Sequence, residues 1–131
     1  MRRLVLKLLP DSYAVCRLKD SGDIPKRVRS LPFYAIVGTE NSITLVCDQK
    51  YISDTEECEK NWRCFEIEGP FDFSEIGIIS KVSGPLAHAK IAVFVISAFE
   101  TDYLLVKDIH LKDALATLKA SGHQIKTIQI N

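Results

Sequence analysis

The sequence predicts an α+β fold made of two consecutive modules, and three observations support this prediction. Apolar runs typical of strands occur along the whole 131-residue chain. Two segments with helical spacing of apolar residues fall between such runs in the second half. Residues 33–48 also resemble residues 93–108 at an offset of 60 positions. A repeat of this length is typical of a duplicated module rather than of a solenoid array.

The first half reads as a less regular module, residues 1–61. Strands are expected over 4–9 and 13–18, separated by the turn signal at 10–12. A short helix is expected over 24–31, with Asp23 as its cap and Pro25 at its first position. Strands follow over 33–38 and 42–48. Residues 53–56 resemble a helix-capping sequence and predict a brief helix within 51–61.

The second half, residues 62–131, reads more clearly. Residues 62–68 alternate as a half-buried strand, and helical spacing begins near Glu75, with Pro85 expected to kink the helix. Strands are expected over 92–99 and 103–106, then a helix that stops at Gly122, then a strand over 124–130. The order βαββαβ, with an antiparallel sheet, is that of the ferredoxin-like unit.

The repeat supports a tandem of such units. Five of sixteen positions are identical, where ordinary composition predicts roughly one. The identical pairs are Ile36 and Ile96, Glu40 and Glu100, Leu45 and Leu105, Val46 and Val106, and Asp48 and Asp108. The alternative is that two apolar hairpins resemble each other by chance.

Composition argues against several classes of partner. Lys plus Arg and Asp plus Glu both number 17, so no overall field attracts nucleic acid or an anionic membrane. The apolar run at the N-terminus is too short to span a membrane, and no secretory signal is present, so a cytoplasmic protein is expected.

The cysteines and histidines suggest neither a metal site nor a catalytic one. The four cysteines are expected to be reduced, with Cys16 and Cys47 in the core, and their spacing does not match a zinc site. His123 follows Gly122 and is expected at a solvated helix end. No cofactor is implied.

Two stretches carry a family resemblance: residues 77–87, GIISKVSGPLA, and residues 95–106, VISAFETDYLLV. They resemble the ACT domain, and more narrowly the ACT modules of CASTOR-type arginine sensors and small bacterial tandem ACT proteins. The resemblance is specific over 62–131. It implies a small-molecule-binding regulatory unit, usually for an amino acid and usually working in pairs.

A ligand site can be assigned on this basis. The start of the helix supplies unpaired N–H groups for a carboxylate near Glu75, Gly77 and Ile78. The resemblance adds the turn residues Ala98, Phe99 and Thr101, and Asp102 as a second acid for an ammonium or cationic group.

Each of these residues also has a purely structural interpretation. Glu75 suits a first helical turn, Asp102 suits a hairpin, and Phe99 suits a core. The chain departs from the arginine sensors at three positions, which leaves the ligand open. Ala98 stands where they have Thr, Thr101 where they have Phe, and Asp72 where they have Gly.

The sequence thus predicts a non-catalytic amino-acid sensor that binds its ligand at the junction of two ACT units. A homodimer is one way to cover an exposed sheet edge. The alternatives are a small enzyme, for which no nucleophile–base motif is found, and an RNA-binding ferredoxin-like protein, for which the aromatic signature is absent.

Overall fold

The computed structural model describes residues 3–54, 56–69 and 76–127. The chain forms two compact units, which we call the inserted unit, Asp11–Trp62, and the flanking unit, Met1–Pro10 together with Arg63–Asn131. The division 1–61 and 62–131 expected from sequence follows the order of the chain. In the structure the first strand belongs to the unit formed by the second half.

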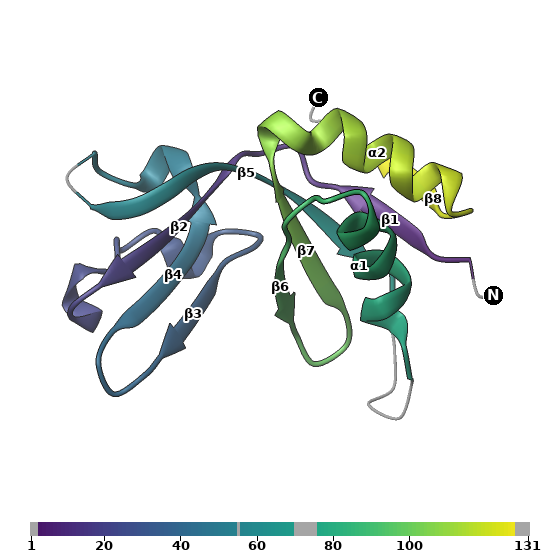
Figure 1. Cartoon of the computed structure of the whole chain (residues 1–131). Helices are drawn as coiled ribbons and strands as arrows, with labels where there is room; N and C mark the ends of the chain where they lie inside the picture. The colour runs from purple at the N-terminus through teal and green to yellow at the C-terminus, as the bar shows by residue number, and fades with distance from the viewer. Residues whose placement is uncertain (1–2, 55, 70–75, 128–131) are drawn as a thin grey trace. The chain divides into compact units, whose positions relative to one another are not determined.

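The flanking unit is a sheet covered by two helices (Figure 1). Its strands follow the order β6-β7-β5-β1-β8. β1 pairs antiparallel with β5 and parallel with β8, and β6 pairs antiparallel with β7. The elements are β1 (Val5–Leu8), the second part of β5 (Glu57–Ile67), α1 (Ile78–His88), β6 (Phe94–Ser97), β7 (Asp102–Lys107), the 3₁₀ turn η4 (Asp108–His110), α2 (Leu111–Ala120) and β8 (Gln124–Thr127).

This order confirms the predicted α+β fold: from β5 onward it is βαββαβ, with β1 added between β5 and β8. Alternation along the strands decides which face is buried. Leu6, Phe65 and Ile67 pack with both helices in one core, to which Val82 and Leu118 contribute from α1 and α2. The opposite face carries Lys7 on β1 and Glu66 on β5.

Helix α1 contains a proline and is supported from outside. Gly77 precedes it with φ of +80°, a conformation that favours glycine. Pro85 lies inside the helix and has no N–H to donate to the carbonyl of Lys81, four residues earlier. That carbonyl instead lies 3.0 Å from Nε2 of His123. His123 is only 4% exposed, so the prediction of a solvated helix end was wrong.

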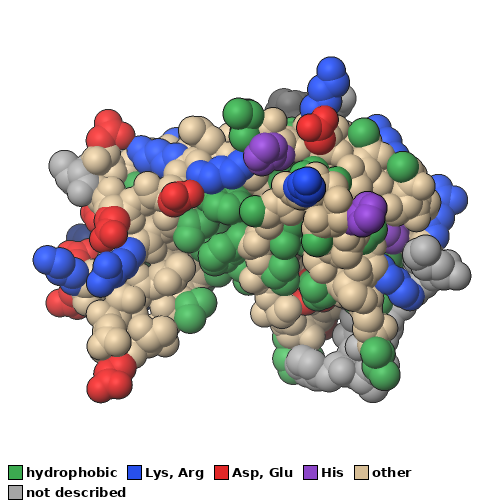
Figure 2. All heavy atoms as spheres, in the orientation of Figure 1, with side chains coloured by type: hydrophobic (Ala, Val, Ile, Leu, Met, Phe, Trp, Pro, Cys, Tyr) green, Lys and Arg blue, Asp and Glu red, His purple; other side chains and the backbone are tan. Residues whose placement is uncertain are grey.

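The inserted unit uses the same strand order without α-helices. β2 (Tyr13–Leu18), β3 (Ala35–Gly38), β4 (Ile43–Asp48) and the first part of β5 form the order β3-β4-β2-β5. Three 3₁₀ turns connect them: η1 (Ser21–Asp23), η2 (Val28–Ser30) and η3 (Gln49–Tyr51). Lysine, arginine and acidic side chains are interspersed over this unit (left in Figure 2).

Two helices predicted for this unit do not form. Residues 24–31 contain only η2, and the capping carboxylate in this loop is Asp20, which precedes η1 and accepts from the N–H of Gly22. The helix expected within 51–61 is replaced by the start of β5 at Glu57. Antiparallel pairing with β2 outweighed the local capping signal there.

The two hairpins are equivalent at an offset of 59 rather than 60. β4 matches β7, and η3 matches η4, at 59 positions. Each turn closes with a 2.9 Å backbone bond, from Thr39 N to Ser42 O and from Ala98 N to Thr101 O. Asn41 therefore corresponds to Glu100. The identity of Glu40 with Glu100 does not reflect equivalent positions in the turns.

The cysteines divide into a bonded pair and two buried thiols. Cys16 on β2 faces Cys58 on β5, and the two form a disulfide, so the expectation of reduced thiols was wrong for this pair. Their partnership depends on strand register, which a sequence pattern does not reveal. Cys47 is fully buried as predicted, and burial raises the pKa of its thiol to about 11.

Candidate functional site

The predicted site residues fall in two places on the flanking unit. Gly77 and Ile78 stand where α1 begins. Ala98, Phe99 and Thr101 form the turn between β6 and β7, and Asp102 opens β7 opposite Ser97. Phe99 is 76% exposed and is therefore not a core residue. Glu75 and Asp72 lie outside the described residues.

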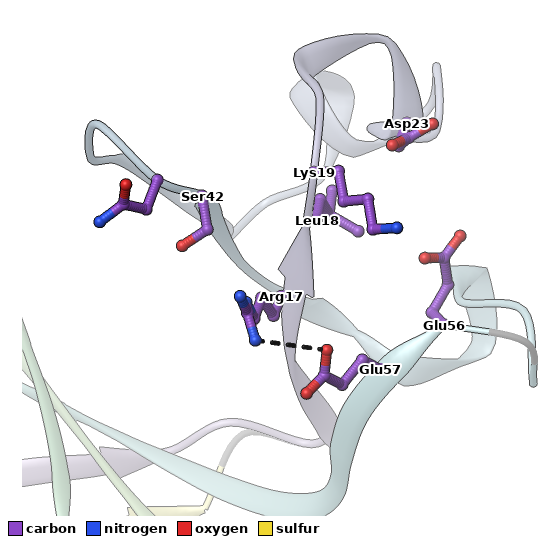
Figure 3. A pocket seen from close by; sticks show the side chains of 8 residues that line it. Arg17, Leu18, Lys19, Asp23, Ser42, Glu56 and Glu57 are labelled. Atoms are coloured by element: carbon purple, nitrogen blue, oxygen red, sulfur yellow. Dashed lines mark ion pairs between the residues drawn. The ribbon is translucent and has the colours of Figure 1, made fainter.

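Each unit has a cavity next to its hairpin turn. In the inserted unit a cavity of about 350 Å³ lies beside the β3–β4 turn (Figure 3). In the flanking unit a cavity of about 260 Å³ lies beside the β6–β7 turn. We call the latter the flanking cavity. It is lined by Lys7, Glu66, Glu68, Gly69, Glu100 and Thr101.

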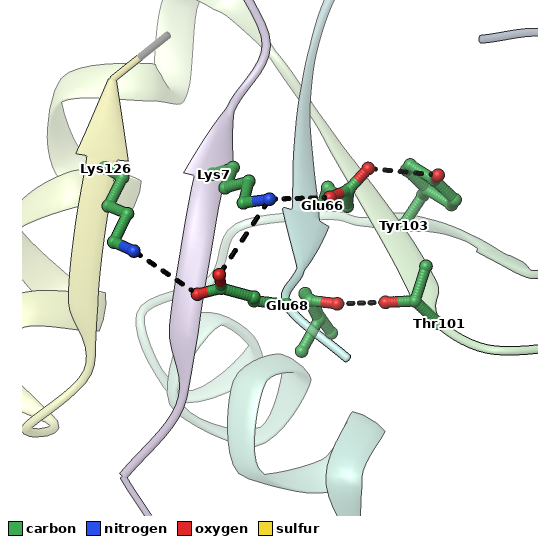
Figure 4. A network of polar contacts seen from close by, with 7 residues as sticks. Lys7, Glu66, Glu68, Thr101, Tyr103 and Lys126 are labelled. Carbon is green, nitrogen blue, oxygen red and sulfur yellow. Dashed lines mark hydrogen bonds and ion pairs between the residues drawn. The ribbon is translucent and has the colours of Figure 1, made fainter. Parts of the chain in front are cut away.

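Thr101 is the predicted site residue that lines the flanking cavity. Its hydroxyl donates to the carbonyl of Ile67, which ties the β6–β7 turn to the end of β5 (Figure 4). That tie fixes Glu100 and Thr101 beside Glu68 and Gly69, where the chain leaves the sheet. The Thr101 hydroxyl thus holds the β6–β7 turn against the end of β5.

A charged network forms one wall of this cavity (Figure 4). Lys7 Nζ lies 3.6 Å from a carboxylate oxygen of Glu66 and 3.9 Å from one of Glu68. Lys126 Nζ lies 3.6 Å from the other oxygen of Glu68. Tyr103 donates its hydroxyl to Glu66 over 3.1 Å. These side chains come from β1, β5, β7 and β8 and share the face opposite the helices.

The electrostatics of the flanking cavity favour a cationic group. Three glutamates and one lysine line it, so acidic charge is in excess. Burial raises the pKa of Tyr103 to about 12, and the Glu66 carboxylate adds to this rise, so the phenol stays a neutral donor. An ammonium or guanidinium could bind the glutamates, while Lys7 could meet a carboxylate.

Sequence reasoning missed most of the residues that line this cavity. Lys7, Glu66 and Glu68 alternate with buried apolar neighbours, so their place on the polar face of a strand could have been inferred. Their mutual contact could not. It requires β1 to lie beside β5, although the two strands are far apart in the chain.

Two properties of the described residues bear on other functions. No group of three His, Cys, Asp or Glu side chains among them is arranged to hold a metal ion. None of the helices in residues 3–54, 56–69 and 76–127 is long and apolar enough to cross a membrane.

Family models match both parts of the chain. A model described as an ACT domain matches residues 57–120, which run from the start of β5 to the end of α2. A second model, described as an N-terminal domain, matches residues 11–55, nearly the whole inserted unit.

Curated relatives are similar over much of the chain. The human cytosolic arginine sensor for mTORC1 subunit 1 is 31% identical over 115 residues, which is 82% of this chain and 35% of the sensor. The mouse protein of the same name is 37% identical over 87 residues, 60% of this chain and 26% of the sensor. The chain thus spans about a third or less of these relatives.

Solved structures share the fold. A protein from Agobacterium tumefaciens is 33% identical with a TM-score of 0.90, and the match covers 100% of this chain and 98% of that one. An aspartate kinase from Clostridium acetobutylicum shares the fold at 12% identity and a TM-score of 0.63, over 90% of this chain and 34% of the kinase. Residues 57–120 of the chain belong to the ACT-domain family.

Proposed function

We propose that the flanking unit is a regulatory module that binds an amino acid in the flanking cavity, without catalysing a reaction. The observation that carries this proposal is the cavity itself, which lies against the β6–β7 turn and presents both signs of charge. A free amino acid needs partners for an ammonium and for a carboxylate, and the lining supplies glutamates for the first and Lys7 for the second.

The excess of acidic charge favours an amino acid with a cationic side chain. Glu66 is already engaged by Lys7 and Tyr103, and Glu68 by Lys7 and Lys126, which leaves Glu100 as the better partner for an incoming cation. The similar sensors are named for arginine, which makes arginine the first ligand to test and lysine the second. This chain departs from those sensors at Ala98 and Thr101, so the choice between arginine and lysine is left to the titration.

The N-terminal turn of α1 is a second part of the proposed site. Gly77 and Ile78 open an eleven-residue helix, whose first N–H groups have no partner within the helix. They are proposed as the alternative to Lys7 for the ligand carboxylate, with Glu75 and Asp102 as further acids. That the ligand lies where two ACT units meet stays a prediction, as does homodimerisation.

Regulation would arise from differential affinity. If ligand binding favours one arrangement of the chain or of its partners, the population of that arrangement rises with ligand concentration. A cytosolic location, as named for the relatives, completes the proposal.

Calorimetric titration of the full chain with arginine, lysine and a set of neutral amino acids tests the proposal. Binding of a cationic amino acid should be weakened about tenfold or more by Glu100→Gln, because one charge-assisted contact is lost. Asp113→Asn, which removes one exposed acid from α2, is the matched control and should leave the affinity unchanged.

Thermal melting gives an independent measurement. A ligand that binds only the folded chain raises the melting temperature as its concentration exceeds Kd. If none of the twenty amino acids raises the melting temperature at millimolar concentration, the proposal is wrong.

A further inference from the structure

We propose that the inserted unit carries a second site for a small zwitterion, in the cavity beside its β3–β4 turn. We call it the inserted cavity. It is lined by Arg17, Leu18, Lys19, Asp23, Asn41, Ser42, Glu56 and Glu57. This inference goes beyond the proposed function and does not require the flanking cavity to be occupied.

The first argument is that the two cavities occupy equivalent places in their units. The last two residues of a four-residue turn line each one, Asn41 and Ser42 in one case and Glu100 and Thr101 in the other. These pairs correspond at the offset of 59 that also relates the hairpins. The framework that forms the flanking cavity is therefore present twice.

The second argument is an ion pair beside each turn, with the two charges exchanged: the cation lies on β2 in the inserted unit, and the glutamate lies on β5 in the flanking unit. In both cavities the strand before the hairpin, β2 or β5, contributes its last residues. Each of these strands has an antiparallel neighbour, and a cation faces a glutamate across the two strands. Arg17 lies opposite Glu57 at 3.8 Å, and Lys7 lies opposite Glu66 at 3.6 Å.

The third argument is the charge of the lining. Two cations, Arg17 and Lys19, are present with three acids, Asp23, Glu56 and Glu57. Figure 3 shows Arg17 and Glu57 paired, with the Lys19 ammonium on the same side of the cavity as Asp23 and Glu56. A cavity with partners for both a carboxylate and an ammonium fits a zwitterion better than an anion or a metal cation.

The existing ion pair does not block such a ligand. The Arg17 and Glu57 side chains are 65% and 74% exposed, and a pair this exposed contributes little to stability. A carboxylate can therefore take the place of Glu57 at Arg17, while an ammonium takes the place of Arg17 at Glu57. Leu18 is 2% exposed and fixes the strand beneath them.

The chemistry also predicts which zwitterion prefers which cavity. The inserted cavity balances its charges more evenly than the flanking cavity, which has three glutamates and one lysine. Asn41 and Ser42 add neutral polar groups. The inserted cavity should therefore favour a small neutral amino acid such as serine or glycine, while the flanking cavity favours a cationic one.

NMR of the isotope-labelled full chain distinguishes the two cavities, because each has its own backbone amides. Serine and glycine are titrated to millimolar concentration, with N-acetylserine and serine amide as probes that lack the ammonium or the carboxylate. We expect saturable shifts at Leu18, Lys19, Asn41 and Ser42 with the zwitterions. The two blocked probes should bind at least about tenfold more weakly, since each loses one charged contact.

Variants test the assignment of the two charged partners. Arg17→Gln and Glu57→Gln should each weaken serine binding about tenfold or more, while Arg17→Lys, which keeps the charge, should retain part of it. Arg29→Gln and Glu40→Gln remove exposed charges from the same unit outside the cavity and should change nothing.

The outcomes separate this inference from the proposed function. Shifts confined to the flanking unit would overturn the second site and leave the proposed function intact. Saturable shifts in the inserted unit with serine or glycine would support the second site, and titration of the same sample with arginine tests the flanking cavity separately. Shifts that persist in both variants, or that the blocked probes reproduce, reflect ionic strength and overturn the inference.

Discussion

The histidine that supports helix α1 gives a quantitative prediction. Nδ1 of His123 accepts from the backbone N–H of Leu4 over 3.2 Å, so its ring proton lies on Nε2 and is donated to the Lys81 carbonyl over 3.0 Å. His123→Ala removes both bonds and leaves both backbone groups without a partner. An unsatisfied buried group costs about 1 to 3 kcal/mol, so with two such groups the flanking unit should lose about 2 to 6 kcal/mol of unfolding free energy.

Pro85 allows the two lost bonds to be separated. Pro85→Ala gives the helix an N–H that reaches the Lys81 carbonyl and so replaces the His123 donor. Pro85→Ala should therefore stabilise the His123→Ala variant by about 1 kcal/mol more than it stabilises the native chain. The difference between the two stabilising effects of Pro85→Ala measures the hydrogen bond to the Lys81 carbonyl alone.

Urea unfolding followed by far-UV circular dichroism is the assay, because both α-helices of the described residues lie in the flanking unit. His88→Ala, an exposed histidine in the last turn of α1, is the control and should stay within about 0.5 kcal/mol of the native value. If Pro85→Ala changes the unfolding free energy equally in the native chain and in the His123→Ala variant, the argument that His123 replaces the missing helix donor is refuted.

Three further predictions address other features. Replacing Cys16 and Cys58 by serine should lower the stability of the inserted unit by about 4 kcal/mol, from loop closure over a separation of 42 residues, and Trp62 fluorescence in urea would measure it. An unchanged midpoint would contradict this. Tyr103 should ionise near pH 12 in an ultraviolet titration, above the ordinary value for tyrosine. Since its pKa is raised above the unfolded value, its contribution to stability is complete below pH 10 and is lost as the pH rises to about 12; Tyr103→Phe should abolish the late transition. Gly77→Ala should cost about 1 to 2 kcal/mol in thermal or urea unfolding, because alanine is strained at a φ of +80°, and no loss would mean that the backbone relaxes there.

The parts of the fold that the sequence predicts are those with local periodicity. Helices α1 and α2 and strands β6 and β7 begin and end within a few residues of their expected bounds, because apolar spacing and the stop at Gly122 are local signals. The start of β5 was missed, since residues 57–61 become a strand only through pairing with β2. Local propensity does not contain that information.

The candidate site was predicted only in part for the same reason. The β6–β7 turn was found by resemblance, and Thr101 does line the flanking cavity. Lys7 was not found, because its contact with Glu66 depends on β1 lying beside β5. The repeat was aligned one position off, since identities in apolar strands align as easily at 60 as at the structural offset of 59.

The position of β1 has a consequence for the order in which the chain folds. During synthesis β1 emerges early, but its neighbour β5 is completed only after the inserted unit, and its other neighbour β8 only after most of the flanking unit. Closing so long a loop is slow relative to forming the hairpins of the inserted unit, which are local in sequence. The inserted unit is therefore expected to form first. A fragment covering only 57–120, the segment matched by the ACT model, would lack both strands of that edge and expose β5 to aggregation.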